Sequence, residues 1–249
     1  MSLVVPAVLP SSRQELEEKL VLFSRIPSVN RVQIDVVDGR FATPASWPYS
    51  PSTKSDLVLG KPPELQRMIV DGYMLPQFDR IEYEIDLMCV NAEEAAAAWL
   101  ALGARSFVFH AESTTSLPRL LSSVRTRLGA GDGSMSGLVS YGIALNISSD
   151  LALIERSLGE VAYVQFMGIV RIGRQGQPFD ERVFEKVRVF RERHPAIPVQ
   201  VDGGVSFGNA KKLLALGVSH LVVGSGILKA KDPAVALNAL EELRSSFGV

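Results

Sequence analysis

In Pro198-Val199-Gln200-Val201-Asp202-Gly203-Gly204-Val205, a short β-branched stretch stops abruptly at two glycines. Leu221-Val222-Val223-Gly224-Ser225-Gly226 has the same form, and a helical pattern follows each run. A strand that ends in glycine lets a ligand reach bare backbone N–H groups, and the dipole of the next helix favours an anion such as phosphate. Because Asp202 lies at the end of its strand, the first run predicts a carboxylate for chemistry beside an anion site.

The rest of the chain repeats the order strand then helix. The expected strands are Leu3–Leu9, Arg31–Val37, Arg80–Met88, Arg105–His110, Leu138–Leu145, Val161–Met167, Val199–Asp202 and His220–Val223. The expected helices cover residues 11–26, 92–102, 117–128, 151–158, 180–194, 209–216 and 233–247. Eight strands that alternate with helices, without a break in composition, predict a single (β/α)8 TIM barrel spanning residues 1–249.

Two segments are too long for this plain repeat. Residues 42–63 form a proline-rich insertion after the second strand, for which we expect a role as a lid or an oligomer contact. Residues 129–137 form a glycine-rich loop, which we expect to be a flexible excursion on the opposite face of the barrel.

Composition narrows the class of protein. The 249 residues are 47% hydrophobic and 21% charged, which is typical of a globular protein with a sizeable core. The net charge of −1, with basic residues scattered along the chain, predicts neither nucleic acid nor membrane as a partner. A single cysteine, Cys89, excludes an internal disulfide and a cysteine-based zinc site. Without a long apolar run or a signal-peptide pattern, we expect a cytoplasmic protein.

Polar side chains gather on the inward faces of the expected strands. Alternation places together Gln33 with Asp35, Glu84 with Asp86 and Met88, and His110 with Glu112, while Asp202 closes the seventh strand. Polar groups inside a barrel are costly unless they are paired, bound to a metal or solvated, so several at one mouth predict an active site. The alternative is that these carboxylates are solvated at the rim or tied to neighbouring loops.

Four other reactive residues fit structural roles better. Asp38 precedes Gly39 after a strand, which is typical of turn chemistry. We expect His194 at the surface, His220 at the start of a strand, and Cys89 in packing, because it is out of phase with the inward residues.

Eight motifs in register resemble the ribulose-phosphate 3-epimerase family. They are Val5-Pro6-Ala7-Val8-Leu9, Ile34-Asp35-Val36-Val37-Asp38-Gly39-Arg40-Phe41, Asp86-Leu87-Met88, Phe109-His110-Ala111-Glu112-Ser113-Thr114, Gly142-Ile143-Ala144-Leu145-Asn146, Gly173-Arg174-Gln175-Gly176-Gln177-Pro178-Phe179, Val201-Asp202-Gly203-Gly204-Val205 and Val223-Gly224-Ser225-Gly226-Ile227. The resemblance implies inversion of the carbon beside a ketone in a sugar phosphate of carbohydrate metabolism. One aspartate removes a proton and the other delivers one to the opposite face. It therefore implies that Asp35 and Asp202 are the catalytic pair.

The resemblance also implies a divalent metal, with a changed set of ligands. Family members use two histidines and two aspartates, and the histidine positions fall on Gln33 and Asp86, so the implied set is Gln33, Asp35, Asp86 and Asp202. Such an all-oxygen set favours Mg²⁺, Mn²⁺ or Ca²⁺ over Zn²⁺. The alternative is that no metal is bound, in which case three carboxylates at one mouth repel and at least one pKa rises.

The substrate site implied by the resemblance lies in the glycine-rich loops. The implied residues are Gly173, Arg174, Gln175, Gly176, Gly203, Gly204, Gly224 and Ser225 for phosphate, with Met88 and Met167 beside the sugar. Arg174 offers a guanidinium fork for phosphate oxygens. Two positions depart from the family pattern: Ala7 replaces a serine and Val37 replaces a methionine.

Three hypotheses follow for the function. The first is a sugar-phosphate epimerase or isomerase with altered metal use or substrate, and the alternative is a phosphosugar-binding relative that has lost epimerisation. A decarboxylase or aldolase is weaker, because the chain lacks an Asp-x-Lys-x-x-Asp array and a lysine at a strand end. Because family members are often dimers or hexamers, we also expect a homo-oligomer that binds a phosphorylated sugar.

Overall fold

Eight parallel strands close into one barrel in sequence order. The computed structural model describes residues 3–49, 62–129 and 139–243. The strands are β1 (Val4–Val8), β2 (Arg31–Val37), β3 (Glu82–Met88), β4 (Ser106–His110), β5 (Ser140–Leu145), β6 (Tyr163–Met167), β7 (Val199–Asp202) and β8 (His220–Val223). β1 pairs with both β2 and β8, which closes the ring. The predicted (β/α)8 TIM barrel is confirmed.

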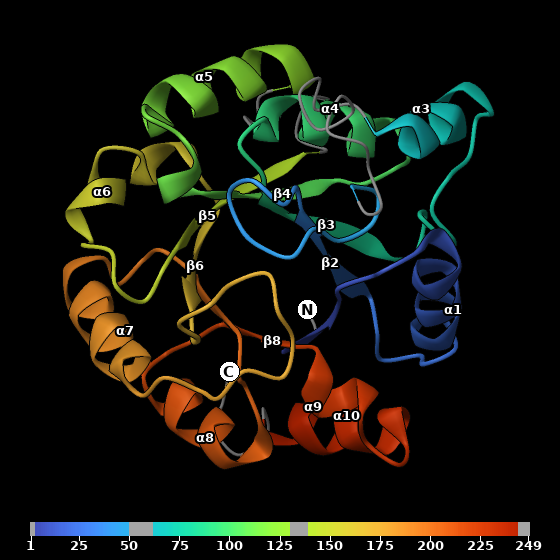
Figure 1. Cartoon of the computed structure of the whole chain (residues 1–249). Helices are drawn as coiled ribbons and strands as arrows, with labels where there is room; N and C mark the ends of the chain where they lie inside the picture. Colours follow the sequence, from blue (N-terminus) through green and yellow to red (C-terminus); the bar gives the residue numbers. More distant parts are fainter. Residues whose placement is uncertain (1–2, 50–61, 130–138, 244–249) are drawn as a thin grey trace.

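Helices surround the barrel (Figure 1). They are α1 (Arg13–Ser24), α3 (Pro63–Val70), α4 (Ala92–Ala101), α5 (Leu117–Leu128), α6 (Ala152–Glu155), α7 (Arg182–Arg193), α8 (Phe207–Ala215), α9 (Ser225–Leu228) and α10 (Pro233–Glu241), with 3-10 turns η1 (Ala111–Ser113) and η2 (Leu158–Glu160). Local sequence fixes several starts: the Ser12 side chain accepts the N–H of Glu15, and Ser206 and Asn209 form a capping box before α8. Among the described helices, none has the length and apolar character to cross a membrane.

The structure differs from the expected helices over residues 151–158 and at the end of the proline-rich insertion. The helix expected over residues 151–158 is one turn, α6, followed by η2. A helix that was not expected, α3, begins at the end of the proline-rich insertion. Pro62 and Pro63 stand at its start, where a missing N–H costs nothing. Residues 50–61 of that insertion, residues 130–138 of the glycine-rich loop and the expected extension of α10 over 244–247 lie outside the described residues.

The two faces of the barrel wall differ in polarity. Apolar side chains on the outer face, such as Ile34, Phe109 and Phe166, are fully buried against the helices in the main hydrophobic core. The inner face contains small apolar clusters and buried polar side chains. The buried polar or charged residues on the strands are Gln33, Asp35, Glu84, Asp86, Ser106, His110, Gln165, Gln200 and Asp202.

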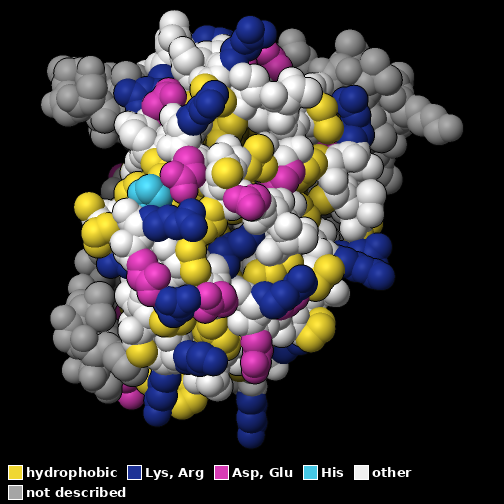
Figure 2. All heavy atoms as spheres, turned by 90° about the vertical axis from the view of Figure 1, so that its left-hand side faces the viewer, with side chains coloured by type: hydrophobic (Ala, Val, Ile, Leu, Met, Phe, Trp, Pro, Cys, Tyr) yellow, Lys and Arg dark blue, Asp and Glu magenta, His cyan; other side chains and the backbone are white. Residues whose placement is uncertain are grey.

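The outer surface over α6 and α7 mixes both signs of charge. Figure 2 shows basic and acidic side chains interspersed on this face. Arg188 pairs with Glu185 and Glu192 along α7, and Arg193 of the same helix pairs with Glu155 of α6. Such exposed pairs contribute little to stability, and their mixed signs give this face no single charge that would attract a charged ligand.

Candidate active site at the carboxyl ends of the strands

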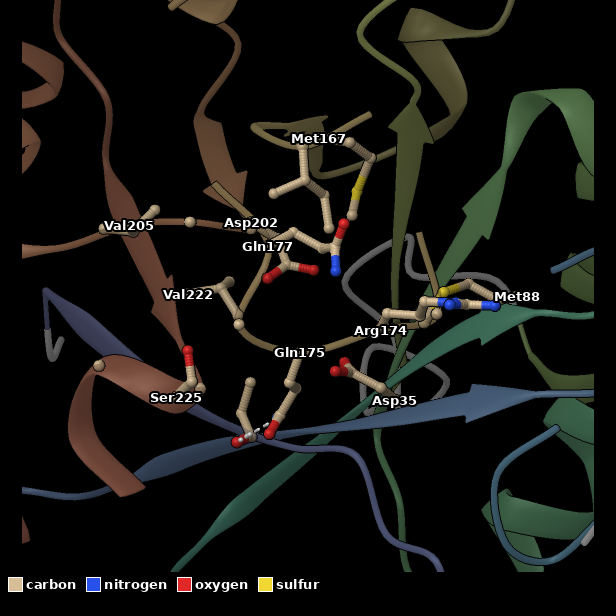
Figure 3. A pocket seen from close by; sticks show the side chains of 18 residues that line it. Asp35, Met88, Met167, Arg174, Gln175, Gln177, Asp202, Val205, Val222 and Ser225 are labelled. Carbon is tan, nitrogen blue, oxygen red and sulfur yellow. Dashed lines mark hydrogen bonds between the residues drawn. The ribbon is translucent and has the colours of Figure 1, made fainter. Parts of the chain in front are cut away.

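Three aspartates meet at the carboxyl ends of β2, β3 and β7. Asp35 and Asp86 are register partners on neighbouring strands, and Asp202 is the last residue of β7. One carboxylate oxygen from each lies within 4.8 Å of the others, and all three residues are buried. Figure 3 shows the carboxylates of Asp35 and Asp202 pointing toward the same space from different strands.

A single amide bridges two of these aspartates. Gln33 Nε2 donates to Asp35 Oδ1 at 2.8 Å and to Asp202 Oδ2 at 3.3 Å. Burial raises the pKa of Asp35 well above its usual range, and the negative charge of Asp86 adds to this rise. Burial and the charge of Asp35 raise the pKa of Asp202 in the same direction, while the hydrogen bond from Gln33 opposes the rise in both.

Asp86 has different partners. His110 Nε2 lies 2.9 Å from Asp86 Oδ1, and Gln165 Nε2 donates to Asp86 Oδ2 at 3.1 Å. Burial disfavours the imidazolium form of His110, but the charge of Asp86 and the hydrogen bond to it outweigh burial and raise the pKa of His110. The Phe41 ring packs on the imidazole at a centroid distance of 5.4 Å. Sequence alternation placed His110 on the inward face but did not assign it to the site.

The three carboxylates fit a hard divalent cation. Their oxygens converge. Gln33 donates to only one oxygen of Asp35 and one of Asp202, so the second oxygen of these two carboxylates is available to a cation. Gln33 was also predicted as a ligand, but its Oε1 faces Gln200 Nε2 at 3.3 Å and its Nε2 faces the aspartates. Binding of a metal through Gln33 therefore remains a prediction, and it requires the side-chain amide of Gln33 to rotate so that its oxygen faces the aspartates.

The residues predicted to bind phosphate and sugar line one pocket with Asp35 and Asp202. They are Met88, Met167, Gly173, Arg174, Gln175, Gly176, Gly203, Gly204, Gly224 and Ser225. At two glycines of this pocket an added side chain would meet close neighbours. Gly204 has φ +67°, and a Cβ there would lie 2.7 Å from Phe179 Cα. A Cβ on Gly224 would lie 2.7 Å from Gln175 Nε2, so the loop over the pocket approaches bare backbone.

The loop after β6 covers this pocket. It crosses the same end of the barrel as the loop after β2 (Figure 1), where Arg174 Nε donates to the carbonyl of Thr43 at 3.1 Å. Gln175 Nε2 donates to the carbonyl of Ala7 at 3.4 Å on the far side. The cavity beneath the loop has a volume of about 40 Å³, which holds only a few water molecules. Any larger ligand therefore requires this loop to move.

Comparison with known proteins identifies the family to which the chain belongs. The sequence pattern of the ribulose-phosphate 3-epimerase family matches residues 65–228, about two thirds of the chain. The chain belongs to this family. It is 28% identical over 195 residues to ribulose-phosphate 3-epimerase of Aquifex aeolicus, a match covering 72% of this chain and 83% of that protein. It is also 28% identical over 245 residues to the chloroplastic ribulose-5-phosphate-3-epimerase of Arabidopsis thaliana, covering 96% and 76%.

Solved structures show the fold alone. The crystal structure of KGPDC from Streptococcus mutans superposes with a TM-score of 0.65. The match covers 99% of this chain and 98% of that one, at 16% sequence identity. At this identity the similarity supports the barrel architecture only. Any argument about the chemistry has to come from the epimerase family and from the residues of the site.

The structure adds two residues to the site that sequence reasoning missed. Gln165 reaches Asp86 from β6, and Gln200 lies below Gln33 and Gln165 with its Nε2 facing both of their amide oxygens. The only available signal was their inward position in the strand alternation. By contrast, Asp38 behaves as expected of turn chemistry, because its carboxylate accepts the backbone N–H groups of Arg40, Phe41 and Val90.

Proposed function

We propose that this member of the epimerase family inverts the carbon beside the ketone of a phosphorylated sugar, with Asp35 and Asp202 as the proton-transfer pair. The observation that carries the proposal is the placement of these two buried carboxylates. They come from β2 and β7, face the same space and share one amide donor. Family membership supports a carbohydrate-phosphate epimerase, and ribulose 5-phosphate is the first substrate to test.

Inversion needs one carboxylate and one carboxylic acid on opposite sides of the substrate carbon. Burial and the charges of neighbouring carboxylates, Asp86 among them, raise the pKa of both Asp35 and Asp202, which favours the protonated form of one of them. The ionised aspartate removes the proton beside the ketone, and the protonated one delivers a proton to the opposite face. Gln33 holds the pair in place, because its one amide donates to an oxygen of each carboxylate.

The remaining need is positive charge where the substrate oxygen becomes negative. A hard divalent cation held by Asp35, Asp86 and Asp202 would supply that charge, and three carboxylates favour Mg²⁺, Mn²⁺ or Ca²⁺ over Zn²⁺. Gln165 and His110 hold the carboxylate of Asp86 from two sides, so its orientation is set by the chain itself.

The glycine loops supply the phosphate end of the site. Gly203, Gly204 and Gly224 line the same pocket as Asp35, and Ser225 begins the short helix α9 there. Arg174 rests on the loop after β2, and movement of its own loop would bring its guanidinium to a bound phosphate. A phosphate held here places the sugar carbons above the aspartates.

The test is proton NMR of ribulose 5-phosphate with the protein in D₂O, with and without Mg²⁺ or Mn²⁺. We expect deuterium to enter at C3 and xylulose 5-phosphate to appear. Asp202→Asn should slow the appearance of xylulose 5-phosphate by about 10²- to 10⁴-fold. Asp38→Asn, which changes a carboxylate bonded to loop N–H groups at the same end of the barrel, should leave it near the wild-type rate. Full turnover by Asp202→Asn would rule out its proton-transfer role.

The replacement of two family histidines by Gln33 and Asp86 favours a second candidate, a phosphosugar-binding relative without epimerisation. The same experiment separates the two functions. Line broadening or shift changes of the sugar phosphate without deuterium incorporation would support binding alone.

A further inference from the structure

Amides and a carboxylate fill the middle of the barrel, where such barrels usually place branched apolar side chains. Gln33, Glu84, Gln165 and Gln200 are each 0% exposed. Burying these groups is costly unless each finds a partner. The four form one hydrogen-bonded column between Arg31, near the amino ends of the strands, and the aspartates at the mouth.

Glu84 forms the base of the column. Its Oε2 accepts hydrogen bonds from the Arg31 guanidinium and the Tyr163 hydroxyl, and its Oε1 accepts one from Gln200 Nε2 at 2.7 Å. Glu84 and Arg31 form a buried ion pair. Because an ionised carboxylate can only accept, the amide above it must present its N–H groups. Glu84 therefore fixes which way Gln200 faces.

The orientation of Gln200 in turn sets the orientation of the side-chain amides of Gln33 and Gln165. Its Nε2 lies 2.8 Å from Gln165 Oε1 and 3.3 Å from Gln33 Oε1, in addition to its contact with Glu84. Both upper glutamines thus present oxygen downward to the same nitrogen. Their own Nε2 groups must then face the mouth of the barrel.

The upper ends of the column meet carboxylates. Gln33 Nε2 donates to Asp35 and Asp202, and Gln165 Nε2 donates to Asp86. A donor facing upward is the only orientation that suits carboxylates at the top and a carboxylate at the base. The column is therefore directional from end to end.

The same reasoning excludes the opposite orientation of the Gln200 amide. Turning Gln200 over would place its Oε1 against acceptor oxygens of Glu84, Gln165 and Gln33. In the observed orientation, Gln200 Oε1 is buried without a hydrogen-bond partner among the described residues. The column leaves one acceptor unsatisfied and so avoids three repulsive contacts.

We propose that Glu84 is a positioning residue, which acts through Gln200 to hold the amides of Gln33 and Gln165 with their donors toward the three aspartates. The effect on turnover rests on the proposed epimerase function, whereas the effect on amide orientation does not. Loss of the Glu84 charge removes the acceptor that orients Gln200, so Gln200 samples both orientations. Gln33 and Gln165 are then oriented by the aspartates alone, which lose firmly held donors.

The test is Glu84→Gln in the full chain, with ¹⁵N labelling of glutamine side chains. We expect the side-chain amide signals of Gln33 and Gln165 to shift or split, although neither amide hydrogen-bonds to Glu84. Turnover of ribulose 5-phosphate should show kcat reduced roughly 10- to 100-fold with KM unchanged, because the phosphate loops are untouched. Ser106→Ala is the matched control, since Ser106 Oγ lies 3.5 Å from Glu84 Oε2 and does not touch the Gln200 side of the carboxylate. It should leave signals and kcat unchanged.

Glu84→Gln leaves Arg31 buried without its carboxylate, so the double change Arg31→Met with Glu84→Gln replaces it if the single variant fails to fold. Unchanged Gln33 and Gln165 amide signals in the folded variant would overturn the proposal. A wild-type protein without turnover would count against the proposed function, and the amide signals would still decide the orientation.

Discussion

Strand β2 places Val32, Ile34 and Val36 against the helices, whereas Gln33 and Asp35 from the same strand lie inside the barrel. The same division holds on β7, where Val199 and Val201 join the outer core and Gln200 and Asp202 face inward. The outer face gains free energy by removing apolar area from water. The inner face gathers carboxylates that repel one another.

With the proposed proton-transfer pair on the inner face, stability and the proposed chemistry lie on opposite sides of one wall. A polar inner face is costly, so it persists where its groups are needed in fixed positions. Changes on the inner face should therefore reduce turnover more than stability, and changes on the outer face should do the reverse. Five measurements test this separation, beginning with the largest expected effect.

Asp202→Asn should give the largest change in turnover. Loss of one proton-transfer group typically lowers the rate by about 10²- to 10⁴-fold. The asparagine keeps an oxygen that can accept from Gln33 and removes a charge repelled by Asp35, so the free energy of unfolding should stay the same or rise. Deuterium incorporation and urea denaturation measure the two effects. A large loss of stability would contradict the separation of the two faces.

Phe166→Ala should have the opposite profile. Phe166 is fully buried on the outer face, and its ring packs against Phe190 at a centroid distance of 5.2 Å. Truncation should lower the free energy of unfolding by about 3–5 kcal/mol, while turnover per folded molecule stays near wild type. Phe207→Ala, at a residue 53% exposed, is the matched control and should change stability by no more than about 0.5 kcal/mol.

A divalent cation should relieve the repulsion on the inner face. At about 100 times its dissociation constant, Mg²⁺ or Mn²⁺ should raise the free energy of unfolding by about 2.7 kcal/mol. Asp86→Asn should weaken this stabilisation, because Asp86 is one of the three converging carboxylates. Asp79→Asn, at an exposed aspartate, should leave it intact. Thermal melting at several metal concentrations measures this stabilisation. Equal stabilisation of the two variants would mean that the cation binds elsewhere.

Without metal, the inner face should also make stability depend on pH. The folded pKa of Asp35 and Asp202 lies well above the unfolded value of about 3.9, so the folded state binds more protons than the unfolded state. Their contribution to stability is fully present below the unfolded pKa and is lost as the pH rises through the folded pKa. Asp202→Asn should therefore gain stability relative to wild type as the pH rises. A constant difference in urea denaturation from about pH 4 to about pH 8 would contradict this.

The outer face was the easier part to predict from sequence. β-branched runs that end at glycine, such as the one before Gly203 and Gly204, mark strands by local pattern alone. The barrel predicted from these runs is confirmed, and so is the epimerase family indicated by the eight motifs. Local pattern was weakest for short elements, because α6 and α9 have four residues each and α3 begins at a pair of prolines.

The inner face could be predicted only in part. Asp202 stands out because it ends its strand beside two glycines, and Asp35 because it lies near the end of its strand, just before the turn at Asp38 and Gly39. The links between inward residues depend on register around the barrel: Gln200 and Glu84 are 116 positions apart, and Gln33 and Asp202 are 169 apart. Alternation shows that Gln165 and Gln200 point inward, but their partners appear only when the barrel closes.

Gly224→Ala tests the edge of the inner face, and its expected effect is the smallest. Gly224 has φ −92°, outside the left-handed region that favours glycine. The new Cβ would lie 2.7 Å from Gln175 Nε2, the flexible end of a side chain that can move aside, so stability should change little. Displacing Gln175 alters the loop over the proposed phosphate site, and we expect KM for ribulose 5-phosphate to rise about tenfold, equivalent to about 1.4 kcal/mol of binding, with kcat nearly unchanged. Gly159→Ala, where a Cβ meets nothing within 4 Å, is the control. An unchanged KM in Gly224→Ala would place phosphate binding outside these loops and confine the inner face to proton transfer.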